Sequence, residues 1–227
     1  MSFSQTFVMS NKVREMKAKG LDVISLTLGE PDFDVPQNIK EAAFEAINNN
    51  FSHYSPVPGF LDLRQAICDK LKRDNNLDYL PSQICVSNGA KQSILNVLAS
   101  VLNDGNEVIL PAPYWVSYDE MVKMMGGTSV FVETSIETEF KITAEQLEKA
   151  ITPKTKVLLY SSPCNPSGSV YTYEELEKIA NVIARYPQIT IISDEIYEFI
   201  NYDGKHTSIA EFPQVYEQTA VINGMSK

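Results

Sequence analysis

Apolar residues along the chain follow two periodicities. Short runs of consecutive apolar, often β-branched residues are typical of buried strands, whereas apolar residues that return every third or fourth position are typical of one face of a helix. The strand-like runs predict strands at residues 23–27, 84–87, 107–110, 128–132, 157–161, 189–193 and 220–223. The helix-like stretches predict helices at residues 11–19, 36–48, around 63–71, around 94–102, 115–125, and two more that end near 151 and 185.

Local signals mark where some of these helices begin. Thr143 with Gln146, and Thr172 with Glu175, have the spacing of a capping box, in which side chains and backbone amides at a helix start bond reciprocally. Pro36 suits the first position of a helix, where its missing N–H is not needed. We therefore expect helices to begin at these three places.

Strands that alternate with helices predict an α/β fold. Because several of the strands are apolar throughout, we expect a mainly parallel sheet with helices on both faces. In such sheets ligands bind beyond the carboxyl ends of the strands, so the loops there are the places to look for chemistry. We expect residues 1–35 to form an N-terminal arm and substrate loop, and residues 36–227 to form a large domain.

Composition excludes several classes of partner. Of the 227 residues, 44% are hydrophobic and 21% are charged, as in globular proteins with a substantial core. The formal net charge of −10 argues against nucleic acid, whose phosphates require clustered Lys and Arg. Three cysteines without repeated spacing indicate reduced thiols and a cytoplasmic protein. We see no signal peptide and no apolar run of membrane-spanning length, so we expect no membrane partner.

Motifs of several common enzyme sites are missing from the sequence. No G-x-G-x-x-G follows a predicted strand, and the segment Ser87-Asn-Gly-Ala-Lys91 does not match a P-loop. The two histidines, His53 and His206, have no partner at ligand spacing, so we expect no metal. The G-x-S-x-G motif of serine hydrolases is absent as well.

Seven short motifs remain, most of them in loops at the ends of predicted strands. They are Gly29-Glu-Pro-Asp-Phe33, Tyr54-Ser-Pro-Val-Pro-Gly59, Gly89-Ala-Lys91, Pro113-Tyr-Trp115, Ser162-Pro-Cys-Asn-Pro166, Asp194-Glu-Ile-Tyr197 and Ser226-Lys227. In this order they resemble the fold-type I aminotransferases that use pyridoxal 5′-phosphate (PLP), the aspartate aminotransferase superfamily. The resemblance covers essentially the whole chain. It implies an enzyme that moves an amino group between an amino acid, aspartate or a similar one, and a 2-oxo acid.

The resemblance implies catalytic roles for Lys227, Asp194 and Tyr197. Lys227 matches the lysine that holds the PLP aldehyde as a Schiff base and then shuttles the substrate proton. Asp194 matches the carboxylate that keeps the pyridine nitrogen protonated, and strand alternation is expected to point its neighbour Glu195 the other way. Tyr197 and Asn165 match the residues that hydrogen-bond the phenolic oxygen of the ring.

The resemblance also implies a phosphate site. Gly89 opens a helix directly after a predicted strand, where amides and the helix dipole favour an anion. The amides of Ala90 and Lys91 match the donors, and Ser226 adds a hydroxyl. Tyr54 matches a tyrosine that reaches the phosphate of a neighbouring subunit, which implies a homodimer with a shared active site.

Three residues are implied near the substrate. Trp115, the single tryptophan, matches the ring that stacks on the cofactor and borders the substrate. Gly29 matches a backbone position near the substrate carboxylate, and Asn165 is implied to contact the substrate as well as the cofactor. Taken alone, each of these residues has an ordinary structural explanation, for example a core anchor for Trp115 or a turn before proline for Asn165. The functional interpretation therefore depends on the motifs occurring together.

The match to the family stops at Lys227. The family continues with an arginine for the phosphate, a second arginine for the substrate carboxylate and a small C-terminal domain, all of which would follow this residue. We therefore expect the 227 residues alone to be poorly active and to expose an apolar surface. Two alternatives stay open, a PLP-dependent lyase on the same fold and a non-catalytic PLP-binding or dimerising fragment. Amino-donor preference stays open too, and Cys164 is given no role.

Overall fold

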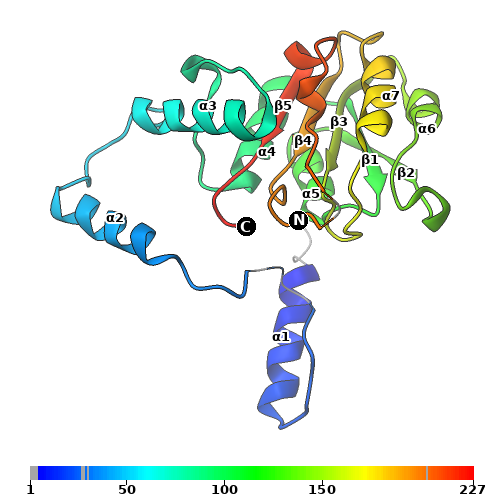
Figure 1. Ribbon diagram of the computed structural model, residues 1–227. Helices are drawn as coiled ribbons and strands as arrows, with labels where there is room; N and C mark the ends of the chain where they lie inside the picture. Colours follow the sequence, from blue (N-terminus) through cyan, green and yellow to red (C-terminus); the bar gives the residue numbers. More distant parts are fainter. Residues whose placement is uncertain (1–4, 27–28, 30, 203) are drawn as a thin grey trace.

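The computed structural model describes residues 5–26, 29, 31–202 and 204–227. Within them, parallel strands form one five-stranded sheet with the order β2-β1-β3-β4-β5 (Figure 1). The strands are β1 Glu107–Ala112, β2 Thr128–Glu133, β3 Thr155–Ser161, β4 Thr190–Asp194 and β5 Thr219–Ile222. This confirms the predicted α/β fold with a parallel sheet.

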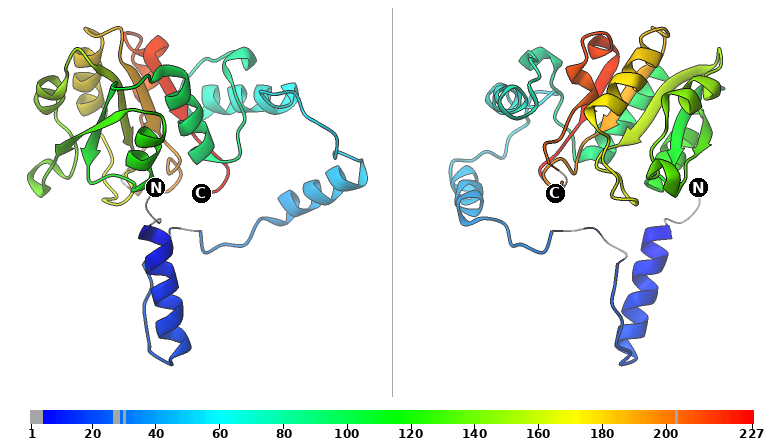
Figure 2. Two further views of the ribbon diagram at one scale, coloured as in Figure 1. Left: turned by 180° about the vertical axis from the view of Figure 1, so that it is seen from behind. Right: turned by 45° about the vertical axis from the view of Figure 1, so that its right-hand side comes forward.

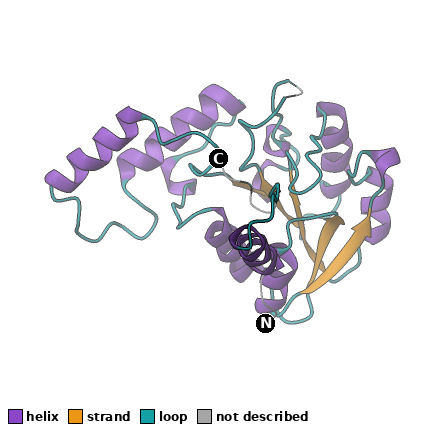
Figure 3. Ribbon diagram, turned by 90° about the horizontal axis from the view of Figure 1, so that it is seen from below, coloured by secondary structure: helices purple, strands orange, loops and turns teal. Residues whose placement is uncertain are grey.

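Seven α-helices are described along the same residues. They are α1 Gln5–Ala18, α2 Gln37–Asn48, α3 Leu61–Asn75, α4 Ala90–Val101, α5 Ser117–Met124, α6 Ala144–Ala150 and α7 Tyr173–Ile183. Short 3₁₀ turns occur at η1 Pro81–Gln83, η2 Ile136–Thr138, η3 Ile209–Glu211 and η4 Tyr216–Gln218. Helices cover both faces of the strands, as the view from below shows (Figure 3).

Alternation along each strand builds a core on each face of the sheet. Val108 and Leu110 of β1 lie in a buried cluster with α4 and α5, whereas Ile109 between them lies in a cluster with α6 and α7. Neighbouring strands follow the same rule, since Leu159 joins the first cluster and Leu158 the second. Both faces are therefore closed by helices, which explains why these strands are apolar throughout.

The strand order places a switch point between β1 and β3. From β1 the chain passes through α5 to the edge strand β2, and it then returns over the other face through α6 to β3. The loops after β1 and β3 consequently leave toward opposite faces of the sheet. A crevice is expected at such a point in open α/β sheets.

Both predicted capping boxes are present. The Thr143 hydroxyl accepts from the amide of Gln146 at 3.2 Å, and the Gln146 side chain accepts from the amide of Thr143 at 2.9 Å. Thr172 and Glu175 make the same pair of bonds, at 3.2 and 2.8 Å. These bonds satisfy amides that have no partner inside the helix, and they fix where α6 and α7 begin.

Two predicted strands are wrong where the structure describes them. Residues 84–87 form no strand, and the amide of Val86 instead bonds the carbonyl of Pro58 at 3.0 Å. Residues 23–26 form no strand either, Ile24 and Leu26 are exposed, and Thr27 lies outside the described residues. An apolar run becomes a strand only when a neighbouring strand takes up its backbone hydrogen bonds, and neither run lies in the sheet.

The N-terminal elements stand apart from the sheet. Helix α1 begins at Gln5, before the predicted start at residue 11, because its first apolar residues, 7–9, follow one another directly and do not recur at helical spacing. Both α1 and α2 project away from the strands in every view (Figure 1, Figure 2). Helix α2 has no buried residue, and its apolar side chains Ile39, Phe44 and Ile47 are exposed.

The core assignment can be tested at Leu159. Its side chain is fully buried in the central strand β3, so Leu159→Ala should lower the free energy of unfolding by about 2–5 kcal/mol. Ile136 is 73% exposed, and Ile136→Ala should change it by no more than about 0.5 kcal/mol. Urea unfolding measures both changes, and equal effects of the two substitutions would contradict the described packing.

Candidate active site

Three neighbouring strands end at the same level of the sheet. In the strand register Ser161 lies opposite Asp194, and Asp194 lies opposite Ile222. The loop with Asn165 follows β3, and the segment with Lys227 follows β5. Residues that are far apart in the sequence therefore leave the sheet side by side.

Asp194 is a deeply buried carboxyl group. It is 4% exposed, and it accepts hydrogen bonds from the Tyr118 hydroxyl at 2.6 Å and from the Ile196 amide at 3.3 Å. Burial raises the pKa of Asp194 above its ordinary value, although both hydrogen bonds oppose the rise. Burial, and then the charge of Asp194, raise the pKa of Tyr118 well above its ordinary value, so this phenol keeps its proton and donates.

Glu195 points to the opposite side of the sheet, as strand alternation predicts. It is 1% exposed and accepts from the hydroxyls of Ser208 at 2.7 Å and Ser193 at 2.9 Å. His206 Nε2 lies 2.9 Å from its other oxygen. Glu195 thus has its own set of partners, separate from those of Asp194.

Tyr197 lies next to other residues of the predicted site. Burial raises the pKa of its phenol, and a side-chain hydrogen bond with Asn165 opposes the rise. The Lys227 amine lies 5.8 Å from the centre of the Tyr197 ring and donates to the carbonyl oxygen of Gly29. Four predicted site residues, from four separate stretches of the chain, therefore meet here.

The start of α4 is connected to Asp194 through two aromatic side chains. Gly89 caps the helix with a positive φ of 83°, a conformation that side-chain-bearing residues rarely adopt. Behind it, the amides of Ala90 and Lys91 lie in the first turn, where the helix offers no carbonyl for them. The Lys91 amine is 4.8 Å from the centre of the Trp115 ring, and Trp115 meets Tyr118 edge-on at 5.5 Å. The helix start is thereby linked through Trp115 and Tyr118 to Asp194.

Two predicted site residues stand outside these contacts. Tyr54 lies on the segment between α2 and α3 and is fully exposed. Ser226 is exposed next to Lys227. Their predicted roles toward a phosphate stay predictions, and for Tyr54 that role involves a second subunit.

Tyr118 is a site residue that the sequence analysis missed. It follows Trp115 by three positions, so both lie on one face of the turn that leads into α5. Tyr118 lies outside the seven motifs, and a tyrosine on the buried side of a helix is usually part of the core. The available signal was its hydroxyl, because a buried tyrosine normally has a hydrogen-bond partner.

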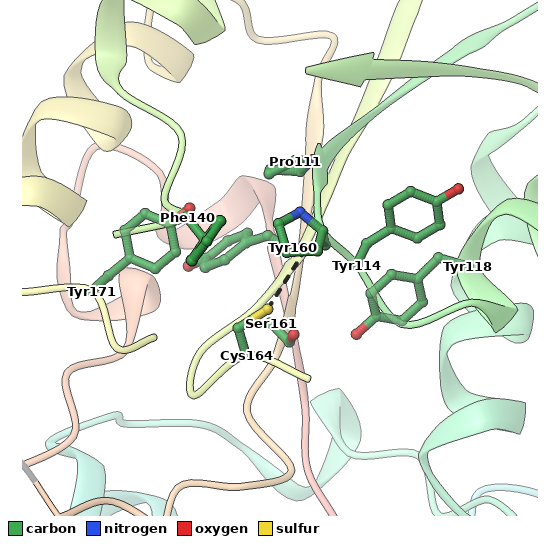
Figure 4. Close-up of a pocket in the computed structure, with 9 residues that line it drawn as sticks. Pro111, Tyr114, Tyr118, Phe140, Tyr160, Ser161, Cys164 and Tyr171 are labelled. Atoms are coloured by element: carbon green, nitrogen blue, oxygen red, sulfur yellow. Dashed lines mark hydrogen bonds between the residues drawn. The ribbon is translucent and has the colours of Figure 1, made fainter. Parts of the chain in front are cut away.

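A narrow pocket lies at the switch point between β1 and β3, with Tyr118 and Ser161 in its lining. It is lined by aromatic side chains that include Tyr114, Phe140 and Tyr171 (Figure 4). Cys164, from the loop after β3, turns its sulfur toward the carbonyl oxygen of Pro113, 3.8 Å away in the loop after β1. Cys164 therefore joins the two loops that border the crevice.

Among the residues that the structure describes, no group of three or more His, Cys, Asp or Glu side chains could hold a metal ion. None of the helices in the described ranges is long and apolar enough to cross a membrane.

Comparisons with known proteins identify the family. The family model described as aminotransferase class I and II matches residues 21–227. A probable aspartate/prephenate aminotransferase of Rhizobium leguminosarum bv. phaseoli is 50% identical over 226 residues, 99% of this chain and 56% of that protein. An aspartate aminotransferase of Bacillus sp. (strain YM-2) is 51% identical over 226 residues, 99% of this chain and 57% of its own length. The chain belongs to the class I and II aminotransferases.

Solved structures give the same result for the fold. The aspartate aminotransferase of Thermus thermophilus with maleate superimposes with a TM-score of 0.95 at 41% identity, over 100% of this chain and 59% of that one. The aspartate aminotransferase of Rhizobium meliloti gives a TM-score of 0.96 at 38% identity, over 100% of this chain and 57% of that one. The chain thus spans little more than half the length of the relatives it matches.

The residues of the site fit PLP, on which this family depends. The hydrogen bonds described for Asp194 come from two neutral groups, a phenol and an amide, which leave its charge without a balancing cation. A protonated pyridine ring would supply that cation. The paired Tyr197 and Asn165 can donate to an anionic ring oxygen, and the start of α4 can receive a phosphate. Lys227 supplies an amine for an aldehyde.

The raised pKa of Asp194 has a consequence for stability. A carboxyl group whose pKa is higher in the folded state stabilises the fold at low pH, and this contribution is lost as the pH rises through the folded pKa. The cofactor-free variant Asp194→Asn lacks this loss. Its free energy of unfolding should therefore increase relative to the wild type as the pH is raised from acidic to neutral, as urea unfolding can measure.

Glu198 provides a control, because its pKa is shifted in the opposite direction and its effect on stability should have the opposite pH dependence. Burial acts to raise its pKa, but hydrogen bonds from Asn75, Lys70 and Asn223 outweigh burial and lower it. The stability contributed by Glu198 is therefore lost as the pH falls, and Glu198→Gln should be most harmful near neutral pH. A common direction of pH dependence for the two variants would contradict the described environments.

Proposed function

We propose that the protein containing this chain is a PLP-dependent aminotransferase. Its amino donor would be aspartate or a similar amino acid, and its acceptor a 2-oxo acid, with prephenate a candidate because relatives are named for it. The observation that carries the proposal is the environment of Asp194, which is buried at the end of β4 and has no described cationic partner. Tyr197, three residues farther on, pairs with Asn165 and has the Lys227 amine near its ring. Membership of the family supports the same conclusion.

Lys227 would carry out the proton transfers. When bound, PLP supplies an electron sink for the electrons left on the substrate Cα. The Lys227 amine would hold the cofactor, be released when the substrate amine takes its place, and then accept the Cα proton at Nζ. The nearby carbonyl of Gly29, which accepts from this amine, would help to aim it. Nζ would then return the proton on the cofactor side, and water would release the 2-oxo acid and leave the amino group on the cofactor, which would end the half-reaction.

The other site residues would hold and tune the cofactor. Asp194 would keep a proton on the ring nitrogen, and Tyr118, by donating to Asp194, would hold the carboxylate in place. Tyr197 and Asn165 would donate to the ring oxygen. Trp115 would stack on the ring and, with Asn165 and Gly29, border the substrate.

The phosphate would bind at the start of α4. The amides of Ala90 and Lys91 behind Gly89 would donate to it, and Ser226 would add its hydroxyl. We propose further that the full protein is a cytoplasmic homodimer in which Tyr54 reaches the phosphate of the other subunit. The full exposure of Tyr54 and the exposed apolar side chains of α2 support a partner at this part of the chain.

A half-reaction tests the proposed activity. The full-length protein loaded with PLP and mixed with L-aspartate, without an acceptor, should convert the absorbance of the lysine-bound cofactor into that of its amino form. Adding a 2-oxo acid should reverse the change. Pyruvate and ammonia formed without an acceptor would instead indicate a lyase, and no change with any amino acid would indicate a non-catalytic PLP-binding protein.

Two substitutions separate the roles of Lys227 and Asp194. Lys227→Ala should abolish the absorbance of the lysine-bound cofactor and slow proton transfer by at least about 10²–10⁴-fold. Asp194→Ala should keep part of the bound PLP but lose most of the rate. Lys205 is exposed and takes part in none of the contacts described for the site, so Lys205→Ala should leave absorbance and rate unchanged. Normal absorbance in Lys227→Ala would rule out the assignment of Lys227.

A further inference from the structure

The segments that carry Tyr197 and Lys227 run side by side beyond the sheet. The amide of Glu195 bonds the carbonyl of Ile222 at 2.8 Å, which extends the pairing of β4 and β5 past the strands. Farther on, a Cβ atom at Gly224 would lie 2.9 Å from Cδ1 of Ile196, closer than side chains approach. The two segments are therefore in close contact, and Gly224 permits this contact.

Glu198 connects the two segments through a buried carboxylate. It is 7% exposed and follows Tyr197 directly. Its Oε1 accepts from the side-chain amide of Asn223 at 2.8 Å, and its Oε2 accepts from Asn75 of α3 at 2.7 Å. The Asn223 side chain also accepts from the amide of Gly224 at 2.7 Å. Asn223 thus links the carboxylate to the backbone that leads to Lys227.

A cation completes the network and keeps Glu198 charged. Lys70 of α3 forms an ion pair with Glu198 and also donates to Asn75 at 2.7 Å. The pKa of Glu198 is lowered even though burial acts to raise it. A buried carboxylate with a cation and two amide donors is a rigid anchor, because removing one partner leaves a desolvated charge.

We propose that Glu198 is a positioning residue that, by holding Asn223, sets where the Lys227 amine lies against the Tyr197 ring. Tyr197 is the residue before Glu198, and Lys227 is four residues beyond Asn223, so one hydrogen bond ties together the backbones that carry both groups. Lys70 and Asn75 anchor this pair to α3 and the body of the protein. The inference deepens the proposed function and rests on it.

The hydrogen bond between Asn223 and Glu198 can be removed by a substitution at Asn223, which is the more exposed of the two residues. Asn223→Ala deletes one hydrogen bond to a buried carboxylate, together with the acceptor of the Gly224 amide. Ser208→Ala is the matched control because it deletes one to the buried Glu195, at 2.7 Å, together with the acceptor of the Ala210 amide. Exchange at Gly224 changes with its own acceptor, so residues 225–227 decide the comparison. Hydrogen exchange of amides 224–227 in the cofactor-free full-length protein, PLP affinity and the pH midpoint of the bound-cofactor absorbance are measured for both. Thermal unfolding reports any general loss of stability.

Asn223→Ala should speed exchange at residues 224–227, weaken PLP binding about tenfold and shift the absorbance midpoint. Ser208→Ala should leave all three unchanged at a comparable loss of thermal stability. Glu198→Gln should behave like Asn223→Ala, and the double variant should be no worse than either single variant. If Glu198→Gln does not fold, Asn223→Ala alone decides.

Two outcomes would overturn the positioning role. One is an Asn223→Ala protein that loses thermal stability while exchange, PLP affinity and absorbance midpoint stay as in the wild type. The other is a Ser208→Ala protein that changes them equally. A wild type that binds no PLP would refute the proposed function instead, and exchange at residues 224–227 in the cofactor-free protein would still test the hydrogen bond.

Discussion

The common level at which β3, β4 and β5 end is the constraint on which the site depends. Parallel pairing sets Ser161, Asp194 and Ile222 side by side, so the loops that follow begin as neighbours. Alternation along β4 then decides which carboxylate faces the α4 and α5 side, and it selects Asp194 over Glu195. A shift of one residue in this register would exchange the two carboxylates and remove the candidate site.

Three buried carboxylates near these strand ends have different surroundings. Glu195 has hydroxyls and a histidine, Glu198 has Lys70 and two amides, and Asp194 has a phenol and one backbone amide. An unpaired charge in a desolvated place is costly, which is why burial raises the pKa of Asp194. Among the three, Asp194 is therefore the group whose environment improves most when a cationic ring binds. Glu198 serves to hold the segments that approach such a ring.

Much of this could be predicted from the sequence, because local patterns reflect local causes. Capping boxes at Thr143 and Thr172, the five strands of the sheet and the opposite orientations of Asp194 and Glu195 all follow from spacing or alternation. The strand order, the bond from Tyr118 and the link between Glu198 and Asn223 join residues far apart in the chain, and spacing carries no information about them. Residues 84–87 mislead for the same reason, since an apolar run does not state whether it has a neighbouring strand.

The most direct test of the account is the position at which PLP attaches. Reducing the PLP-treated full-length protein with borohydride converts the lysine adduct into a stable amine, and peptide mass mapping locates it. The account requires the adduct at Lys227, the lysine that the structure places beside Tyr197. An adduct at Lys91, at the start of α4, or spread over surface lysines would contradict it, because those amines lie outside the group formed by the strand ends.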